Sequence, residues 1–106
     1  MTIKEFIKES FKEEYGYCIR PKVICNDGFS ISVQGSASHY CRPRKTQDWY
    51  DALELGYPSE EELSIMEYAE NKSTPTDTVY SCVPIEVIEE IIIKHNGVNI
   101  IETFKK

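Results

Sequence analysis

Apolar residues with helical spacing predict a helix at the start of the chain. The predicted helix spans residues 3–14, and its apolar positions are Ile3, Phe6, Ile7 and Phe11. Thr2 and Glu5 have the spacing of a capping box, in which each side chain bonds the backbone N–H of the other residue. The predicted helix therefore has a defined beginning and one apolar face.

Two more helices are predicted in the second half of the chain. Ser59 and Glu62 form a second capping-box pattern, which predicts a helix over residues 60–70. Pro84 suits the first position of a last helix that ends at Asn96-Gly97. The apolar positions of this last helix are Ile85, Val87, Ile88, Ile91 and Ile92. So broad an apolar face is expected to pack across a sheet.

The middle of the chain alternates in the manner of strands. Residues 17–25 are rich in β-branched and aromatic side chains, and Asn26-Asp27-Gly28 suits a tight turn. In the strand that follows, Phe29, Ile31 and Val33 alternate with Ser30, Ser32 and Gln34. Residues 49–55 are predicted to form a third strand, with Trp49 and Leu53 on the same face, although the apolar residues there would also suit a helix. A further short strand is predicted over residues 78–83. Residues 98–106 are expected to add an edge strand or to fray.

These elements predict one α+β domain over residues 1–106. It consists of a small antiparallel sheet of about four strands with two or three helices packed on one face. The N-terminal helix covers residues 1–14, a hairpin-containing sheet residues 17–57, and a helix-strand-helix unit residues 59–97. Polar faces on both hairpin strands indicate that helices cover the sheet on one side only.

Composition excludes several classes of protein. The 106 residues are 41% hydrophobic and 28% charged, which is typical of a folded domain and unlike a disordered chain. The longest apolar run is Ile91-Ile92-Ile93, far short of a membrane span. Charges interrupt the first residues before any apolar h-region, so no secretory signal is expected and the cytoplasm of a host cell is the predicted compartment.

The net charge of −6 hides a separation of charge along the chain. Residues 15–50 hold five basic and two acidic side chains, net +3, whereas residues 51–90 hold eleven carboxylates and Lys72 alone, net −10. Six of these acids are predicted to form an acidic face: Glu54, Glu60, Glu61, Glu62, Glu67 and Glu70. A row of carboxylates resembles a phosphate backbone and attracts the basic channel of a nucleic-acid-binding protein. The alternative is a solvated surface that keeps the protein soluble.

The sequence offers little support for catalysis. It contains neither GxGxxG nor GxxxxGK[ST], and the spacings of its four cysteines include no CxxC. Reduced, mostly buried thiols are expected in place of disulfides. A zinc site from Cys25, His39 and Cys41 lacks paired ligand spacing, and neither Cys41 with His39 nor Cys82 with His95 has the signature of a nucleophile and its base. We therefore expect no enzyme, no cofactor and no metal.

One loop mixes cations with aromatic rings. Its residues are His39, Tyr40, Arg42, Arg44 and Lys45. The two guanidiniums would grip phosphate while a ring stacks on a base, as in nucleotide sites. The alternative is a solvated loop whose arginines pair with the acidic residues.

A likeness to known proteins rests on six segments and spans residues 17–98; the segments are residues 20–34, 39–44, 56–60, 75–80, 83–87 and 95–97. They resemble small proteins of phages and mobile elements of Gram-positive bacteria. The resemblance implies a phage setting, in which proteins of this size are often counter-defence factors such as anti-CRISPR inhibitors. It transfers no catalytic residue to a position of this chain.

Three functions from different classes follow. The first is a stoichiometric inhibitor that binds a host defence nuclease, a Cas9-type effector above all, or another nucleic-acid-binding protein, through the acidic face. The second is a sponge for a nucleotide immune signal, with Arg42, Arg44 and Lys45 on the phosphates and Tyr40 stacking. The third is a structural or regulatory phage module, including a homodimer that pairs through edge strands.

Overall fold

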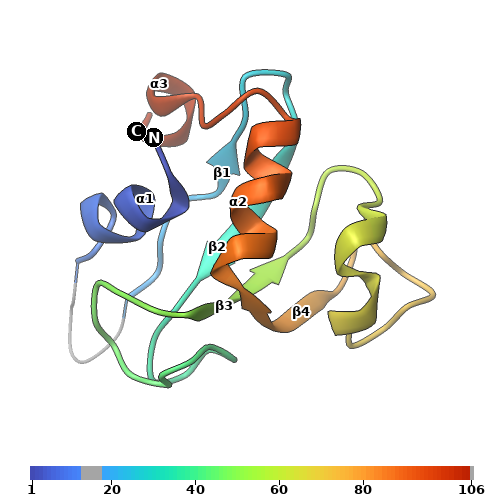
Figure 1. The fold of residues 1–106 in the computed structure, drawn as a ribbon, viewed down its shortest axis with the longest axis horizontal. Coiled ribbons are helices and arrows are strands. Elements are labelled where there is room, and N and C mark those ends of the chain that lie inside the picture. Colours follow the sequence, from blue (N-terminus) through green and yellow to red (C-terminus); the bar gives the residue numbers. More distant parts are fainter. Residues whose placement is uncertain (13–17, 106) are drawn as a thin grey trace.

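The computed structural model describes residues 1–12 and 18–105 (Figure 1). Its elements, in chain order, are α1 (Ile3–Glu9), β1 (Val23–Ile24), β2 (Ser30–Gln34), β3 (Ala52–Gly56), the 3₁₀ helix η1 (Leu63–Tyr68), β4 (Val79–Pro84), α2 (Ile85–Lys94) and α3 (Ile100–Thr103). The strands form one antiparallel sheet in the order β1-β2-β3-β4. The predicted α+β class is confirmed.

Helix α1 begins as predicted but ends earlier. The Glu5 N–H donates to Thr2 Oγ1 at 3.1 Å and the Thr2 N–H donates to the Glu5 carboxylate at 2.8 Å, which confirms the capping box. The predicted extension to residue 14 is wrong for Phe11 and Lys12, which lie beyond the helix, and its last two residues lie outside the described residues. Ser10 closes the helix, since its hydroxyl donates to the Phe6 carbonyl at 2.5 Å and serine favours helix ends over helix interiors.

The predicted hairpin is present, although its first strand is short. The Cys25 N–H donates to the Phe29 carbonyl at 2.7 Å, and Gly28 takes the positive φ of +95° that the turn needs. The first strand begins at Val23 and not at residue 17, which lies outside the described residues. Ile19 is 66% exposed and Pro21 has no N–H to donate, so this segment does not join the ladder.

The third and fourth strands meet with an irregularity. Leu53 pairs with Val83 and Leu55 with Tyr80, so that β4 carries one extra residue opposite Glu54. Strand β3 begins at Ala52, three residues later than predicted, and Trp49 lies outside it with its side chain 60% exposed. Pro84 is the last residue of β4 and the N-cap of α2, one position before its predicted place.

Other segments of the chain cover both outer strands. Next to β1, the Ile24 N–H donates to the Thr103 hydroxyl at 3.0 Å and the Asn99 N–H donates to the Ile24 carbonyl at 2.7 Å. Next to β4, the Glu70 N–H donates to the Val79 carbonyl at 3.0 Å. The C-terminal segment was expected to add an edge strand or to fray, and both alternatives are wrong for Ile100–Thr103: after one bridge to Cys25 the chain forms α3, which Asn99 caps.

The second capping box is also wrong. The hydroxyl of Ser59 accepts the Ser30 N–H at 2.9 Å and so binds the hairpin in place of its own helix. The Glu62 side chain is buried and makes no cap hydrogen bond. The predicted helix over residues 60–70 is therefore a 3₁₀ helix that begins at Leu63.

The core lies between the sheet and the helices. Helix α2 crosses one face of the sheet, with α1 and α3 beside it (Figure 1). The largest fully buried side chains are Tyr80, Phe6, Ile3, Ile7, Ile31, Leu53, Leu55, Ile65, Ile88, Val23, Val33 and Val83. The polar positions of β2 lie on the other face and are partly exposed. This arrangement confirms that helices cover one face of the sheet.

A buried arginine joins three segments at one end of the core. Arg20 is 2% exposed, and its guanidinium donates to the carbonyls of Ile7, Gly35 and Gln47 at 2.7–3.4 Å. The guanidinium also lies 5.9 Å from the ring centroid of Tyr50. Five fixed N–H donors let one arginine bond the end of α1, the end of β2 and the following loop together.

Candidate functional site

The basic loop is tied to the rest of the chain. Arg42 Nε lies 2.5 Å from Asp51 Oδ1, in an exposed ion pair. The Arg44 Nε–H donates to the Ala37 carbonyl at 3.1 Å, and its guanidinium carbon lies 5.2 Å from the centroid of the Tyr40 ring. Of the two interpretations for this loop, the geometry favours pairing with acidic residues for Arg42. Lys45 is exposed.

The histidine and thiols near this loop have local partners. His39 Nδ1 lies 2.6 Å from Ser36 Oγ, and the Cys41 thiol donates to the Ser36 carbonyl at 3.2 Å. Burial raises the pKa of the Cys41 thiol, and burial together with Asp27 raises that of Cys25 to about 11. These two thiols therefore stay protonated and unreactive near neutral pH. Within residues 1–12 and 18–105, no group of three His, Cys, Asp or Glu side chains could hold a metal ion.

Most of the predicted acidic face is on the surface. Glu60, Glu61, Glu67 and Glu70 are exposed along the segment that contains η1. Glu54 is half-buried, and burial and the nearby charge of Glu70 raise the pKa of its carboxyl group. The Tyr40 N–H and the Arg44 charge act on the same carboxylate. The acidic face and the basic loop thus meet at Glu54.

Glu62 does not belong to this face, which corrects the sequence prediction. Its side chain is 3% exposed, and Lys94 Nζ lies 3.1 Å from both carboxylate oxygens. The Ser64 hydroxyl donates to the same carboxylate, and His95 Nε2 lies 3.4 Å from it. Burial alone raises the pKa of Glu62, but the hydrogen bonds from Lys94, His95 and Ser64 outweigh it and lower the pKa.

The buried histidine extends this group of charges to the hairpin. His95 Nδ1 lies 2.7 Å from Asp27 Oδ2, so the imidazole bridges a turn carboxylate and the carboxylate of Glu62. The backbone N–H of Phe29 and the His95 ring both hold the pKa of Asp27 below its ordinary value. The network Asp27-His95-Glu62-Lys94 joins the hairpin turn, the start of η1 and the end of α2. The contacts with His95 and Lys94 explain why the Glu62 side chain points inward.

Two large apolar side chains are exposed beside the remaining acids. Leu63 is 76% exposed at the start of η1, and Ile93 is 75% exposed on α2. Between η1 and α2 lies a groove of about 360 Å³, lined by Glu62, Ser64, Glu90, Ile91, Ile93 and Lys94. Sequence reasoning missed this pair because Ile93 stands in an apolar run. The helical spacing of 3.6 residues per turn points Ile93 away from the side that holds Ile85, Ile88 and Ile92, and this spacing could have indicated that Ile93 is exposed.

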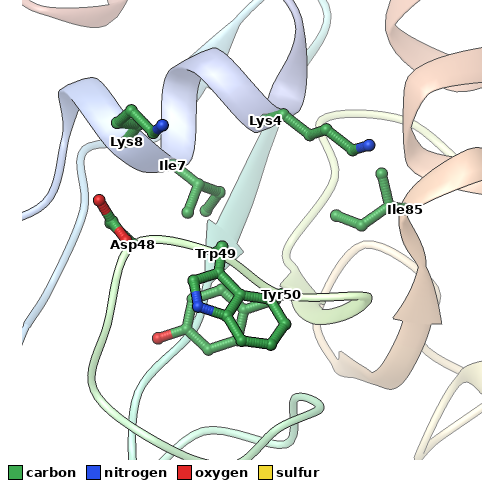
Figure 2. A pocket seen from close by; sticks show the side chains of 7 residues that line it. All are labelled: Lys4, Ile7, Lys8, Asp48, Trp49, Tyr50 and Ile85. Carbon is green, nitrogen blue, oxygen red and sulfur yellow. The ribbon is translucent and has the colours of Figure 1, made fainter.

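A second hollow lies between α1 and the residues before β3. This cavity of about 270 Å³ is lined by Lys4, Ile7, Lys8, Asp48, Trp49, Tyr50 and Ile85 (Figure 2). Sequence reasoning placed Trp49 in the sheet with Leu53, whereas its exposed indole stands at the cavity. We call this site the Trp49 cavity.

Within the part of the chain that the structure describes, no helix has the length and apolar character needed to cross a membrane. Comparisons with protein-family models, with curated proteins and with solved structures found no match to this chain.

Proposed function

We propose that this chain is a non-catalytic inhibitor that binds the nucleic-acid channel of a bacterial defence nuclease in the host cytoplasm. A Cas9-type effector is the first candidate, because of the resemblance to small phage proteins. The observation that carries the proposal is the surface around η1, which combines exposed glutamates with exposed Leu63 and Ile93. We call this surface, made of Glu60, Glu61, Leu63, Glu67, Glu70 and Ile93, the η1 surface.

The charges of the η1 surface suit a basic partner. Lys72 is the sole cation of residues 51–90, and the nearby ammonium of Lys94 is already held by the carboxylate of Glu62. Exposed like charges in this density repel one another and attract a positively charged groove. Channels that hold nucleic acid are lined by lysine and arginine, so carboxylates at the surface compete with phosphates for the same side chains.

Leu63 and Ile93 add apolar contacts, which the glutamates do not provide. Charged groups at the edge of an interface raise the association rate more than the affinity, whereas buried apolar anchors slow dissociation. Ile93 lines the groove between η1 and α2, and Leu63 lies at the start of η1 close to the exposed acids Glu60 and Glu61, as anchors inside a polar rim do. The proposal therefore assigns recognition to the glutamates and residence time to Leu63 and Ile93.

The first experiment measures binding to guide-loaded Cas9-type effectors from Gram-positive bacteria, together with cleavage of target DNA. The wild-type chain is expected to bind one to one, more weakly at high salt, and to slow cleavage. Glu60→Lys with Glu61→Lys is expected to weaken binding at least about tenfold, because each substitution replaces attraction by repulsion. The control, Glu9→Lys with Glu102→Lys, changes net charge equally on α1 and α3, away from η1 (Figure 1).

A second pair of variants tests the apolar anchors. Leu63→Ser with Ile93→Ser is expected to raise the dissociation rate with little change in the association rate. Ile100→Ser with Ile101→Ser removes exposed isoleucines from α3 and is the matched control. Unimpaired cleavage by every effector tested, or equal effects of the η1 and control variants, would overturn the proposal.

A further inference from the structure

The Trp49 cavity combines three kinds of group on two facing segments. Ile7, Lys4 and Lys8 come from α1, and Trp49 and Tyr50 come from the segment before β3 (Figure 2). Ile7 and Tyr50 are buried and form an apolar floor, whereas the indole of Trp49 is 60% exposed. A flat aromatic surface therefore stands at the edge of an apolar hollow that two ammonium groups border.

Within residues 1–12 and 18–105, neither lysine forms an ion pair with an acidic side chain. Lys4 and Lys8 are four positions apart on α1 and so lie on the same side of the helix. No ion pair joins either of them to an acid among the residues that the structure describes, although Asp48 lines the same cavity. Figure 2 shows Asp48 on the side of Lys8, while the Lys4 ammonium extends toward Ile85 on the other side. Lys4, Lys8 and Asp48 are the charged residues in the lining, so the lining carries a net positive charge.

We propose that the Trp49 cavity binds a small anion that carries a flat ring, with a nucleoside monophosphate as its ligand class. The base would stack on the indole, since base–aromatic stacking is favourable and every base has a flat face. The phosphate would lie on the α1 side of the cavity, where Lys4 and Lys8 supply positive charge, since ammonium groups are point-charge donors suited to phosphate oxygens. The apolar floor of Ile7 and Tyr50 would exclude water beneath the base.

The size of the cavity limits the ligand. A volume of about 270 Å³ lies just below the range of roughly 300–1,000 Å³ that is usual for small-molecule sites. One base with its phosphate fits this scale better than a dinucleotide. This site also differs from the basic loop of the sequence prediction, whose Arg42 and Arg44 already have partners within the chain.

The inference is independent of the proposed inhibitor function. The Trp49 cavity lies on the α1 side of the molecule, and η1 lies at the opposite side (Figure 1). Substitutions in one site therefore leave the other unchanged. Loss of one activity with retention of the other is the expected pattern for variants of each site.

Trp49 is the single tryptophan of the chain, so it reports directly on its own cavity. The experiment titrates the full chain with AMP, GMP, CMP and UMP and follows indole fluorescence, with free tryptophan as the optical control. Saturable quenching by at least one nucleotide is expected. Adenosine and inorganic phosphate, tested separately, are each expected to bind at least about tenfold more weakly, because each lacks one of the two contacts.

Three variants assign the binding to named side chains. Lys4→Gln with Lys8→Gln is expected to weaken nucleotide binding about tenfold or more, whereas Lys22→Gln with Lys105→Gln, which removes two exposed lysines elsewhere, leaves it unchanged. Asp48→Asn is expected to tighten binding. Trp49→Ala, followed by calorimetry, is expected to abolish it, and circular dichroism checks that each variant folds.

Three results would overturn the inference. The first is the absence of a saturable response to any of the four nucleotides. The second is equal binding of inorganic phosphate and nucleotide, which would leave the indole without a role. The third is equal loss of binding in the Lys4/Lys8 variant and the Lys22/Lys105 variant.

Discussion

The imidazole of His95 lies flat against the ring of Phe29, with ring centroids 3.9 Å apart and ring planes 8° apart. The Phe29 ring covers one face of the imidazole, and the two ring nitrogens of His95 face Asp27 and Glu62. The contact joins the end of α2 to the hairpin, and His95 and Phe29 are 66 positions apart in the chain. A single side chain thus holds together two elements that the sequence predicts separately.

Replacement of His95 is expected to destabilise the fold. His95→Ala removes the stacking contact and leaves the buried Glu62 carboxylate with fewer partners, at a cost of about 2–4 kcal/mol. Urea denaturation measures the change in free energy of unfolding. His95→Phe, which keeps the ring but not the polar contacts, is expected to recover part of the loss. A variant as stable as the wild type would contradict this account.

The stability of the protein is expected to fall in acid because of Glu62 and Asp27. Their pKa values are lowered in the folded state, so their ionised forms stabilise the fold above the ordinary values of 4.5 and 3.8, and this contribution is lost as pH falls below them. The urea midpoint of the wild type should therefore approach that of Glu62→Gln as the solution is acidified. Exposed Glu67→Gln is the control. A difference between wild type and Glu62→Gln that stays constant down to about pH 3 would rule out this linkage.

Glu54 is expected to show the opposite sign. Burial raises the pKa of its carboxyl group, so the ionised form costs stability at neutral pH and protonation relieves that cost. Glu54→Gln should therefore raise the urea midpoint near neutral pH, and the gain should disappear in acid. Glu60→Gln, on the exposed surface, is the matched control. A gain that is the same at all pH values would show that charge is not its cause.

Gly35 packs where no side chain fits. A Cβ atom there would lie 2.7 Å from Tyr50 Cε2 and 2.9 Å from Leu53 Cδ2. Gly35→Ala is expected to cost about 1–3 kcal/mol, since the core must shift to accept it. Gly56→Ala is the control, because its nearest contact, Val79 Cγ1, lies at an ordinary 3.5 Å. Denaturation curves that rank Gly56→Ala as the more destabilising variant would contradict this packing.

Loss of Arg20 is expected to be the most damaging polar substitution. Arg20→Ala leaves the carbonyls of Ile7, Gly35 and Gln47 without their donor, at a cost of about 3–5 kcal/mol. Arg20→Lys should recover little, because an ammonium group lacks the planar fork that reaches all three. Thermal unfolding of both variants measures the difference, and full recovery by lysine would contradict it.

The elements with local causes could be predicted from the sequence. The Thr2–Glu5 capping box needs contacts only three residues apart, and the Asn26-Asp27-Gly28 turn is specified by its own backbone preferences. Ser59 and Glu62 carry the same local signal as Thr2 and Glu5, yet their side chains bind Ser30 and Lys94, which are distant in the chain. Tertiary partners override local patterns there.

Only part of the candidate sites could be predicted, because tertiary contacts again decide the rest. The exposure of Glu60, Glu61 and Glu67 follows from charge, which sequence alone reveals. The Trp49 cavity joins residues more than 40 positions apart, and nothing local marks the packing of α1 against the segment before β3. The exposure of Leu63 and Ile93 was not predicted for another reason, because an apolar residue is expected in the core.

The hydrogen bonds from Asn99 and Glu70 to the outer strands bear on how this molecule tolerates crowding. Bare strand margins act as templates on which a second molecule can continue the ladder, and this is how many β-rich proteins convert to fibrils. Here the C-terminal segment and the stretch after η1 occupy those positions. Many copies can therefore accumulate beside one another with little tendency to polymerise through their backbones.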